Sequence, residues 1–179
     1  MNHIYQILVF LISFTTLFSQ GFEDNQLWHA EKFQKKINEK NSLSLEQDFR
    51  AGENMSTLLY VHADFGIKHR LSNKISLSVN FREVFEKKED IFMQEHRPHG
   101  TISTKIEIGS LDISARSRLE YRMKPGKDPV FRNRDMVSIK LRRELTSLKL
   151  VPYIADEIFF DIENSELNRN RFYVGSTIG

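Results

Sequence analysis

The sequence predicts an all-β protein, an antiparallel up-and-down transmembrane β-barrel of which about nine strands are present. Three observations predict this fold. Apolar and polar residues alternate with a period of two from Leu27 onward, short polar segments separate the alternating runs, and the N-terminus resembles that of an exported chain. Transmembrane barrels of single bacterial chains have even strand numbers. Nine strands ending at Gly179 therefore predict a barrel that is incomplete at the C-terminus.

The first twenty residues predict a signal peptide. Ile7 to Phe18 form an apolar run that is too short to cross a bilayer as a helix, which needs about 20 residues. We therefore expect residues 1–20 to be a signal peptide cleaved near Gln20, and residues 21–179 to be the β-barrel domain. A buried N-terminal helix is the alternative. The chain contains no cysteine, which excludes disulfides, thiol chemistry and an acylated cysteine anchor.

Period-two segments then follow one another along the chain. Successive side chains of a strand point to opposite faces, so each segment has one apolar and one polar face. Strand lengths of roughly 9–12 residues match what a tilted strand needs to cross a bilayer. The segments, of which the first and last are the least regular, are 27–37, 43–51, 59–67, 75–81, 101–108, 111–123, 137–141, 151–159 and 171–178.

The segment 111–123 shows the two faces most clearly. We expect its apolar side chains to contact lipid and its charged side chains to face water; these are Ile113, Ala115 and Leu119 against Arg116, Arg118 and Glu120. In the segment 151–159, the apolar face is predicted to continue through Val151, Tyr153, Ala155 and Phe159, with Glu157 as an interruption.

The connections between the segments are predicted to alternate in length. Tight turns are expected at 38–41, 70–73, 109–110 and 146–147. Longer polar loops are expected at 86–98, 124–129 and 161–168. Short turns on one rim and longer loops on the other are typical of transmembrane barrels.

Charged residues occupy even positions of the segment 111–123 and of the strand expected to follow it. They are predicted to form a ladder that faces the barrel interior: Arg116, Arg118, Glu120, Arg122, Arg132, Arg134, Lys140 and Arg142. One interpretation is a structural network of ion pairs, and the other is an interior that attracts anions or binds a ligand. The Asn-Arg-Asn-Arg run at 168–171 is expected to join the ladder.

Two further kinds of site have weaker support. Glu95, His96 and His99 lie in the longest predicted loop, but their spacing matches no strong metal motif, so neither a metal nor another cofactor is expected. Serines are plentiful, but none lies in a G-x-S-x-G elbow, so we do not expect an enzyme. Lysine and arginine (26) nearly balance aspartate and glutamate (24), which gives no reason to expect nucleic acid binding.

Several stretches resemble one protein family. They are Trp28 in the first segment, KHRLSNKISLSVNFREVF, SARSRLEYRMKP, FRNRDMVSIKLRREL, VPYIADEIFFD and NRNRFYVGSTIG. Together they resemble the domain of unknown function 2490, a family of outer-membrane β-barrels found widely in Bacteroidota. The resemblance implies a barrel in the outer membrane whose family members continue beyond the point where this chain stops. It implies contact with outer-membrane lipid and with the barrel-assembly machinery, and no catalytic residues.

The leading hypothesis is an outer-membrane β-barrel without enzymatic activity, with a charged, arginine-rich interior and an unknown ligand. Alternation alone does not exclude a soluble barrel, because a lipocalin turns its apolar face inward and its charged face to water. The first alternative is therefore a soluble, lipocalin-like barrel in the periplasm that binds an apolar ligand. The second alternative is a lipid hydrolase of the outer membrane.

Overall fold

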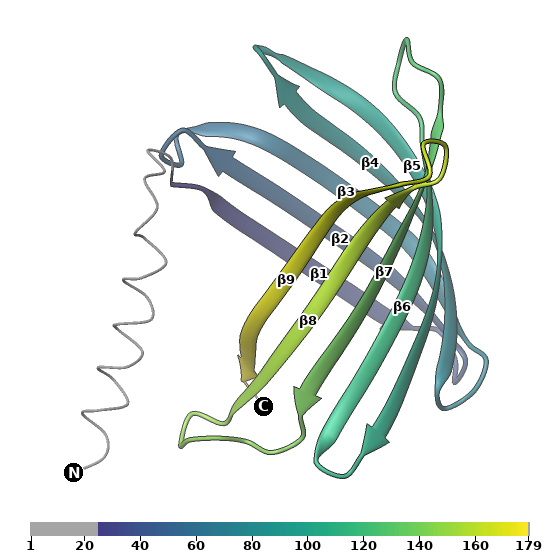
Figure 1. Cartoon of the computed structure of the whole chain (residues 1–179), viewed down its shortest axis with the longest axis vertical. Coiled ribbons are helices and arrows are strands. Elements are labelled where there is room, and N and C mark those ends of the chain that lie inside the picture. Colours follow the sequence, from purple (N-terminus) through teal and green to yellow (C-terminus); the bar gives the residue numbers. More distant parts are fainter. Residues whose placement is uncertain (1–24, 179) are drawn as a thin grey trace.

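A computed structural model describes residues 25–178 of the chain, and the predicted signal peptide at 1–20 lies outside this range. Nine long strands account for nearly all of the described residues (Figure 1). They are β1 (Leu27–Lys36), β2 (Asn41–Gly52), β3 (Thr57–Arg70), β4 (Ile75–Lys88), β5 (Ile91–Ile108), β6 (Leu111–Arg122), β7 (Val130–Leu141), β8 (Leu150–Asp161) and β9 (Glu166–Ile178). No helix within residues 25–178 is long and apolar enough to cross a membrane.

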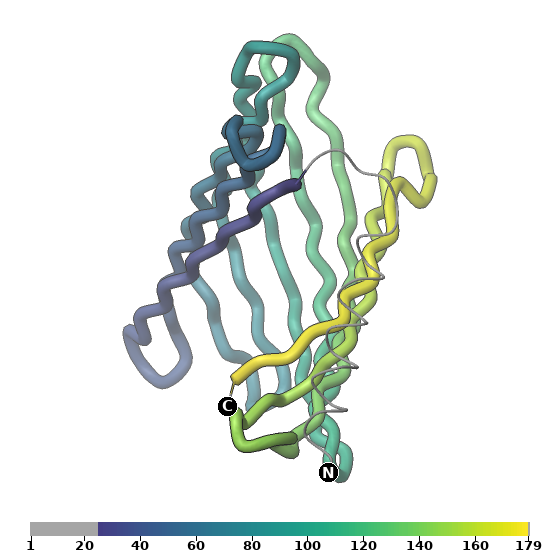
Figure 2. The backbone as a smooth tube through the Cα atoms, turned by 90° about the vertical axis from the view of Figure 1, so that its left-hand side faces the viewer, coloured from purple at the N-terminus to yellow at the C-terminus, as the bar shows by residue number. Residues whose placement is uncertain are grey.

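The nine strands form one antiparallel sheet in sequence order, from β1 to β9. Each strand pairs with the next through a hairpin, which is the up-and-down topology predicted from the sequence. The sheet curls into a half-barrel, and β1 and β9 border its open side (Figures 1 and 2). In the described chain these two strands pair on one side only, so they are the edges of the sheet.

The sheet has a charged concave face and an apolar convex face. Phe65 and Val79 point outward and are 58% and 67% exposed, whereas the neighbouring Asp64 is buried. Within residues 25–178, the buried side chains comprise ten polar or charged residues and only four apolar ones, Val84, Val151, Ala155 and Phe159. This distribution is the reverse of a soluble domain, in which apolar side chains fill the interior.

The face predicted for β8 is wrong. Val151, Ala155 and Phe159 are buried on the concave face together with Glu157, while Ile154 and Ile158 are exposed on the convex face. Apolar residues occupy both faces of this strand, so alternation could not determine its orientation. Glu157, which the sequence pattern presents as an interruption of the apolar face, lies on the side that faces the other buried charges.

The predicted alternation of short and long connections is also wrong. The sequence predicts that residues 86–98 form the longest loop. In the structure, β4 and β5 pair along this stretch as far as Lys88 and Ile91, so only residues 89–90 form the turn. Conversely, the tight turn expected at 146–147 is part of an eight-residue connection, 142–149. Both faces of this hairpin carry polar groups, so residues 86–97 show no alternation and resemble a polar loop in the sequence.

Polar side chains interrupt the convex face in a few places, and they bond to one another there. The Asn133 amide donates to Asp135 at 2.7 Å, and the Asn170 amide donates to Asp156 at 2.9 Å. Ser117, which breaks the apolar face of β6, lies within 3.4 Å of the Asn133 side chain. These contacts give each of the two outward carboxylates a hydrogen bond, which lowers the cost of burying them against any apolar surroundings.

Candidate functional site

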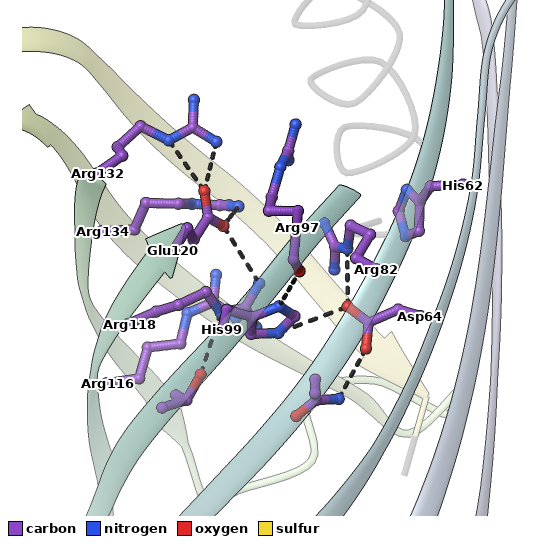
Figure 3. A network of polar contacts seen from close by, with 12 residues as sticks. His62, Asp64, Arg82, Arg97, His99, Arg116, Arg118, Glu120, Arg132 and Arg134 are labelled. Atoms are coloured by element: carbon purple, nitrogen blue, oxygen red, sulfur yellow. Dashed lines mark hydrogen bonds and ion pairs between the residues drawn. The ribbon is translucent and has the colours of Figure 1, made fainter. Parts of the chain in front are cut away.

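The charged residues of β6 and β7 meet on the concave face around Glu120, whose side chain is 0% exposed (Figure 3). The register pairs Glu120 with Arg132 and Arg118 with Arg134, so these side chains share one face of the two strands. Arg132 donates through Nε to Glu120 Oε2 at 2.9 Å, and Arg134 donates through Nη1 to Oε1 at 2.9 Å. A third guanidinium, that of Arg118, approaches Oε1 at 3.9 Å.

A second buried carboxylate, Glu157 of β8, extends this network. Arg116 donates to Glu157 Oε1 at 2.7 Å, and Arg134 donates to the same oxygen at 2.8 Å. The Tyr173 hydroxyl of β9 donates to Oε2 at 3.0 Å. Arg134 thus bridges Glu120 and Glu157, and the network joins four consecutive strands, β6 to β9.

Glu95 of β5 is the third buried carboxylate. Arg122 donates two hydrogen bonds to it, from Nε at 2.6 Å and from Nη2 at 3.0 Å, and Arg97 donates from Nε at 2.9 Å. Lys124, in the loop after β6, lies 3.5 Å from Glu95 Oε2. Burial, and then the charge of Arg122, lower the pKa of the Lys124 ammonium below its ordinary value.

A separate set of charges lies on β2 to β5, and the sequence interpretation missed it. Arg82 donates to Asp64 at 2.7 Å and to Glu46 at 3.2 Å. His99 of β5 lies 3.5 Å from Asp64, and its other ring nitrogen lies 3.3 Å from the backbone carbonyl of Arg97. The sequence contains the signal for this set, because Glu46, Asp64 and Arg82 occupy the polar positions of alternating strands.

A glycine makes room for this second set. Asn80 donates to Asp64 at 2.7 Å, and its amide lies directly over Gly66. A Cβ atom at position 66 would collide with the Asn80 side chain, so any other residue there would displace the amide from Asp64.

The structure brings most of the predicted ladder together. The members that join the buried carboxylates are Arg116, Arg118, Glu120, Arg122, Arg132 and Arg134. Lys140 lies on the same face, opposite Asp112 in the register. Arg142 follows the end of β7, is half-exposed at the opposite rim, and lies 2.9 Å from Glu107 and 3.6 Å from Asp112. It does not belong to the central network.

The three weak metal candidates are not brought together. Glu95 and His99 are buried on the concave face, whereas His96 points to the convex face and contacts Glu83 at 2.6 Å. All three lie within β5 and not in a loop, and adjacent positions of a strand face opposite sides. In the described part of the chain, no group of three histidine, cysteine, aspartate or glutamate side chains is arranged to hold a metal ion.

The arginines of the Asn-Arg-Asn-Arg run reach the same face from β9. Together with two arginines of β7, they surround the buried ring of Phe159. The distances from the guanidinium carbon to the ring centroid are 4.6 Å for Arg134, 5.0 Å for Arg171, 5.3 Å for Arg132 and 5.9 Å for Arg169. Each contact lies within the range of a cation–π interaction.

These features define a class of protein, a β half-barrel with an apolar convex face and an arginine-rich concave face. A family model described as "Protein of unknown function (DUF2490)" matches residues 25–179. The chain therefore belongs to this family, as the resemblance of its motifs indicated. No curated protein and no solved structure matches the chain.

Proposed function

We propose that this chain forms the wall of an outer-membrane β-barrel with a hydrated, arginine-rich interior. The observation that supports this proposal is the reversed distribution of side chains: charged residues are buried on the concave face, and large apolar residues are exposed on the convex one. A transmembrane barrel turns its apolar face to lipid and its polar face inward. The strands are 10 to 18 residues long, which is sufficient to cross a bilayer when tilted.

The same observation favours the membrane barrel over a soluble, lipocalin-like one. A soluble barrel that binds an apolar ligand encloses an apolar interior and shows polar groups to water. Here the concave face buries Glu95, Glu120 and Glu157, while Phe65 and Val79 are open to the surroundings. A large exposed apolar surface of this kind is typical of contact with lipid or with another protein.

We assign the barrel no catalytic role. A serine hydrolase needs a hydroxyl nucleophile within hydrogen-bond reach of a base. In residues 25–178, the hydrogen bonds of the histidine side chains go to Glu31, Tyr60, Glu46, Asn41, Glu83 and the Arg97 carbonyl, and none goes to a serine or threonine. The proposed partners are outer-membrane lipid and the barrel-assembly machinery that inserts the chain.

Alkaline carbonate extraction of isolated envelopes tests the proposed location. The protein is expected to remain in the membrane pellet and to enter solution only with detergent, because its convex face needs an apolar solvent. A soluble periplasmic protein, followed in the same fractions, controls for incomplete washing. Release of this chain into the carbonate supernatant along with that control would rule out the membrane proposal in favour of the soluble alternative.

A further inference from the structure

We infer that the four arginines around Phe159 form a binding site for a phosphate-type oxyanion. The inference rests on the proposed function and deepens it, because it names the ligand class that a hydrated, arginine-rich interior would take. The site consists of Arg132 and Arg134 from β7, Arg169 and Arg171 from β9, and the ring of Phe159 from β8.

The buried carboxylates near this cluster already have cationic partners, and Asp161, opposite Arg132 in the register, accepts hydrogen bonds from the backbone of Glu163 and Asn164. Glu120 accepts hydrogen bonds from Arg132 and Arg134, and Glu157 accepts them from Arg116 and Arg134. Arg118 also lies 3.9 Å from Glu120, so four arginines share these two glutamates, and Arg169 and Arg171 add two further positive charges nearby. This part of the concave face carries an excess of positive charge.

The excess positive charge is that of Arg169 and Arg171. Neither has a carboxylate within ion-pair distance among residues 25–178, and the guanidinium of each lies against the Phe159 ring. Arg134 Nε is a further donor without a partner: it is buried and makes no hydrogen bond within residues 25–178. Buried polar donors are ordinarily paired, so an unpaired one at a cationic cluster indicates a place for an acceptor.

The ring of Phe159 lies at the centre of the four guanidinium groups. Its side chain is buried, and all four guanidinium carbons lie within 5.9 Å of its centroid. Glu120 and Glu157 neutralise part of this charge, and the positive charges that remain repel one another unless a further anion lies among them. A guanidinium held against an aromatic face keeps its N–H donors in the guanidinium plane, where they are available to a ligand.

The donor geometry favours a phosphate group. Arginine binds carboxylate and phosphate through paired N–H donors. A carboxylate offers two oxygens and one plane, whereas a phosphate offers oxygens in several directions and can accept from forks that approach from different strands. Arg134, whose Nε is unpaired, comes from β7, and Arg169 and Arg171 come from β9, on either side of Phe159 in β8. The phosphate can be a free ion or the headgroup of a lipid, since both present the same oxygens.

Calorimetric titration of the folded full-length chain with inorganic phosphate, in an uncharged detergent, tests the site. Saturable binding is expected for the unmodified chain, weakened at least tenfold in the double variant Arg169→Gln, Arg171→Gln. The matched control is Arg142→Gln, Arg143→Gln, which removes the same charge at the opposite rim and is expected to bind within twofold of the unmodified chain. Circular dichroism establishes that all three proteins keep their strands.

A second arm identifies the source of the phosphate. If short-chain phosphatidic acid displaces inorganic phosphate at a lower concentration than free phosphate does, the site takes a lipid headgroup. If free phosphate is the better competitor, the site takes the free ion. Either result supports the inference.

Three results would overturn the inference: no saturable binding, equal binding by the Arg169/Arg171 variant, or equal weakening in the rim control. The last would mean that only the overall charge matters. These failures are distinct from failure of the proposed function, because carbonate extraction and lipid-contact measurements do not depend on any anion.

Discussion

Replacing Glu120 with glutamine is expected to lower the free energy of unfolding by about 3–5 kcal/mol, the usual cost of removing one partner from a buried ion pair. Glu120 is completely buried and accepts hydrogen bonds from Arg132 and Arg134. Glutamine keeps the size of the side chain but loses the charge, so two buried guanidinium groups would be left without their counter-ion. Denaturant unfolding of the refolded protein in detergent, followed by tyrosine and tryptophan fluorescence, measures the change.

Glu107→Gln is the matched control for this substitution. Glu107 also pairs with an arginine, Arg142, at 2.9 Å, but its side chain is 52% exposed at the rim. Exposed ion pairs contribute about 0–1 kcal/mol, so its effect is expected to be small. Equal losses for the two variants would contradict the assignment of Glu120 as the centre of the buried network.

Replacing Val79 with arginine is expected to impair insertion and to lower the folded stability in lipid bilayers. An arginine on the lipid face of a barrel costs about 2–4 kcal/mol at the bilayer midplane, and less toward the interfaces. Val79 is 67% exposed on the convex face, so the substitution creates no clash within the protein itself. The cost arises only if lipid surrounds this position.

Val79→Leu is the control, because it preserves an apolar side chain at the same position and is expected to fold as the unmodified chain does. Urea titration in vesicles of defined composition measures the stability of both variants. In a soluble protein, an arginine at this exposed position would be neutral. A Val79→Arg variant with unchanged stability in vesicles would therefore argue against contact with lipid.

The sequence predicted the strands well where one face is apolar and the other is charged. In β6, the alternation of Ile113 and Leu119 with Arg116, Arg118 and Glu120 determined both the strand and the face that joins the charge network. An up-and-down order also followed, because turns separate consecutive strands by few residues. The family membership expected from the motifs is confirmed by the match over residues 25–179.

Alternation failed where it carries no contrast. The β4–β5 hairpin has Glu83 and His96 on the convex face and Arg82 and Glu95 on the concave face, so its polarity resembled that of a loop. In β8, apolar residues on both faces concealed the orientation of Phe159.

The arrangement of the site was even less accessible from the sequence. Its contacts join residues on different strands, such as Arg116 and Glu157, and depend on the register of β6, β7 and β8 together. A single sequence identifies which residues share a face of one strand. It does not determine which residue of the neighbouring strand lies opposite them, so the grouping of arginines around Phe159 required the structure.

Site-directed labelling of two adjacent positions tests the central claim most directly, namely that the convex face meets lipid and the concave face meets water. The chain has no cysteine, so Ser78→Cys and Val79→Cys each provide one labelling site. These residues are neighbours in β4 but point to opposite faces. A fluorophore at position 79 should be quenched by a spin-labelled lipid, and one at position 78 by a water-soluble quencher. Quenching of position 79 by the aqueous reagent alone would contradict the account.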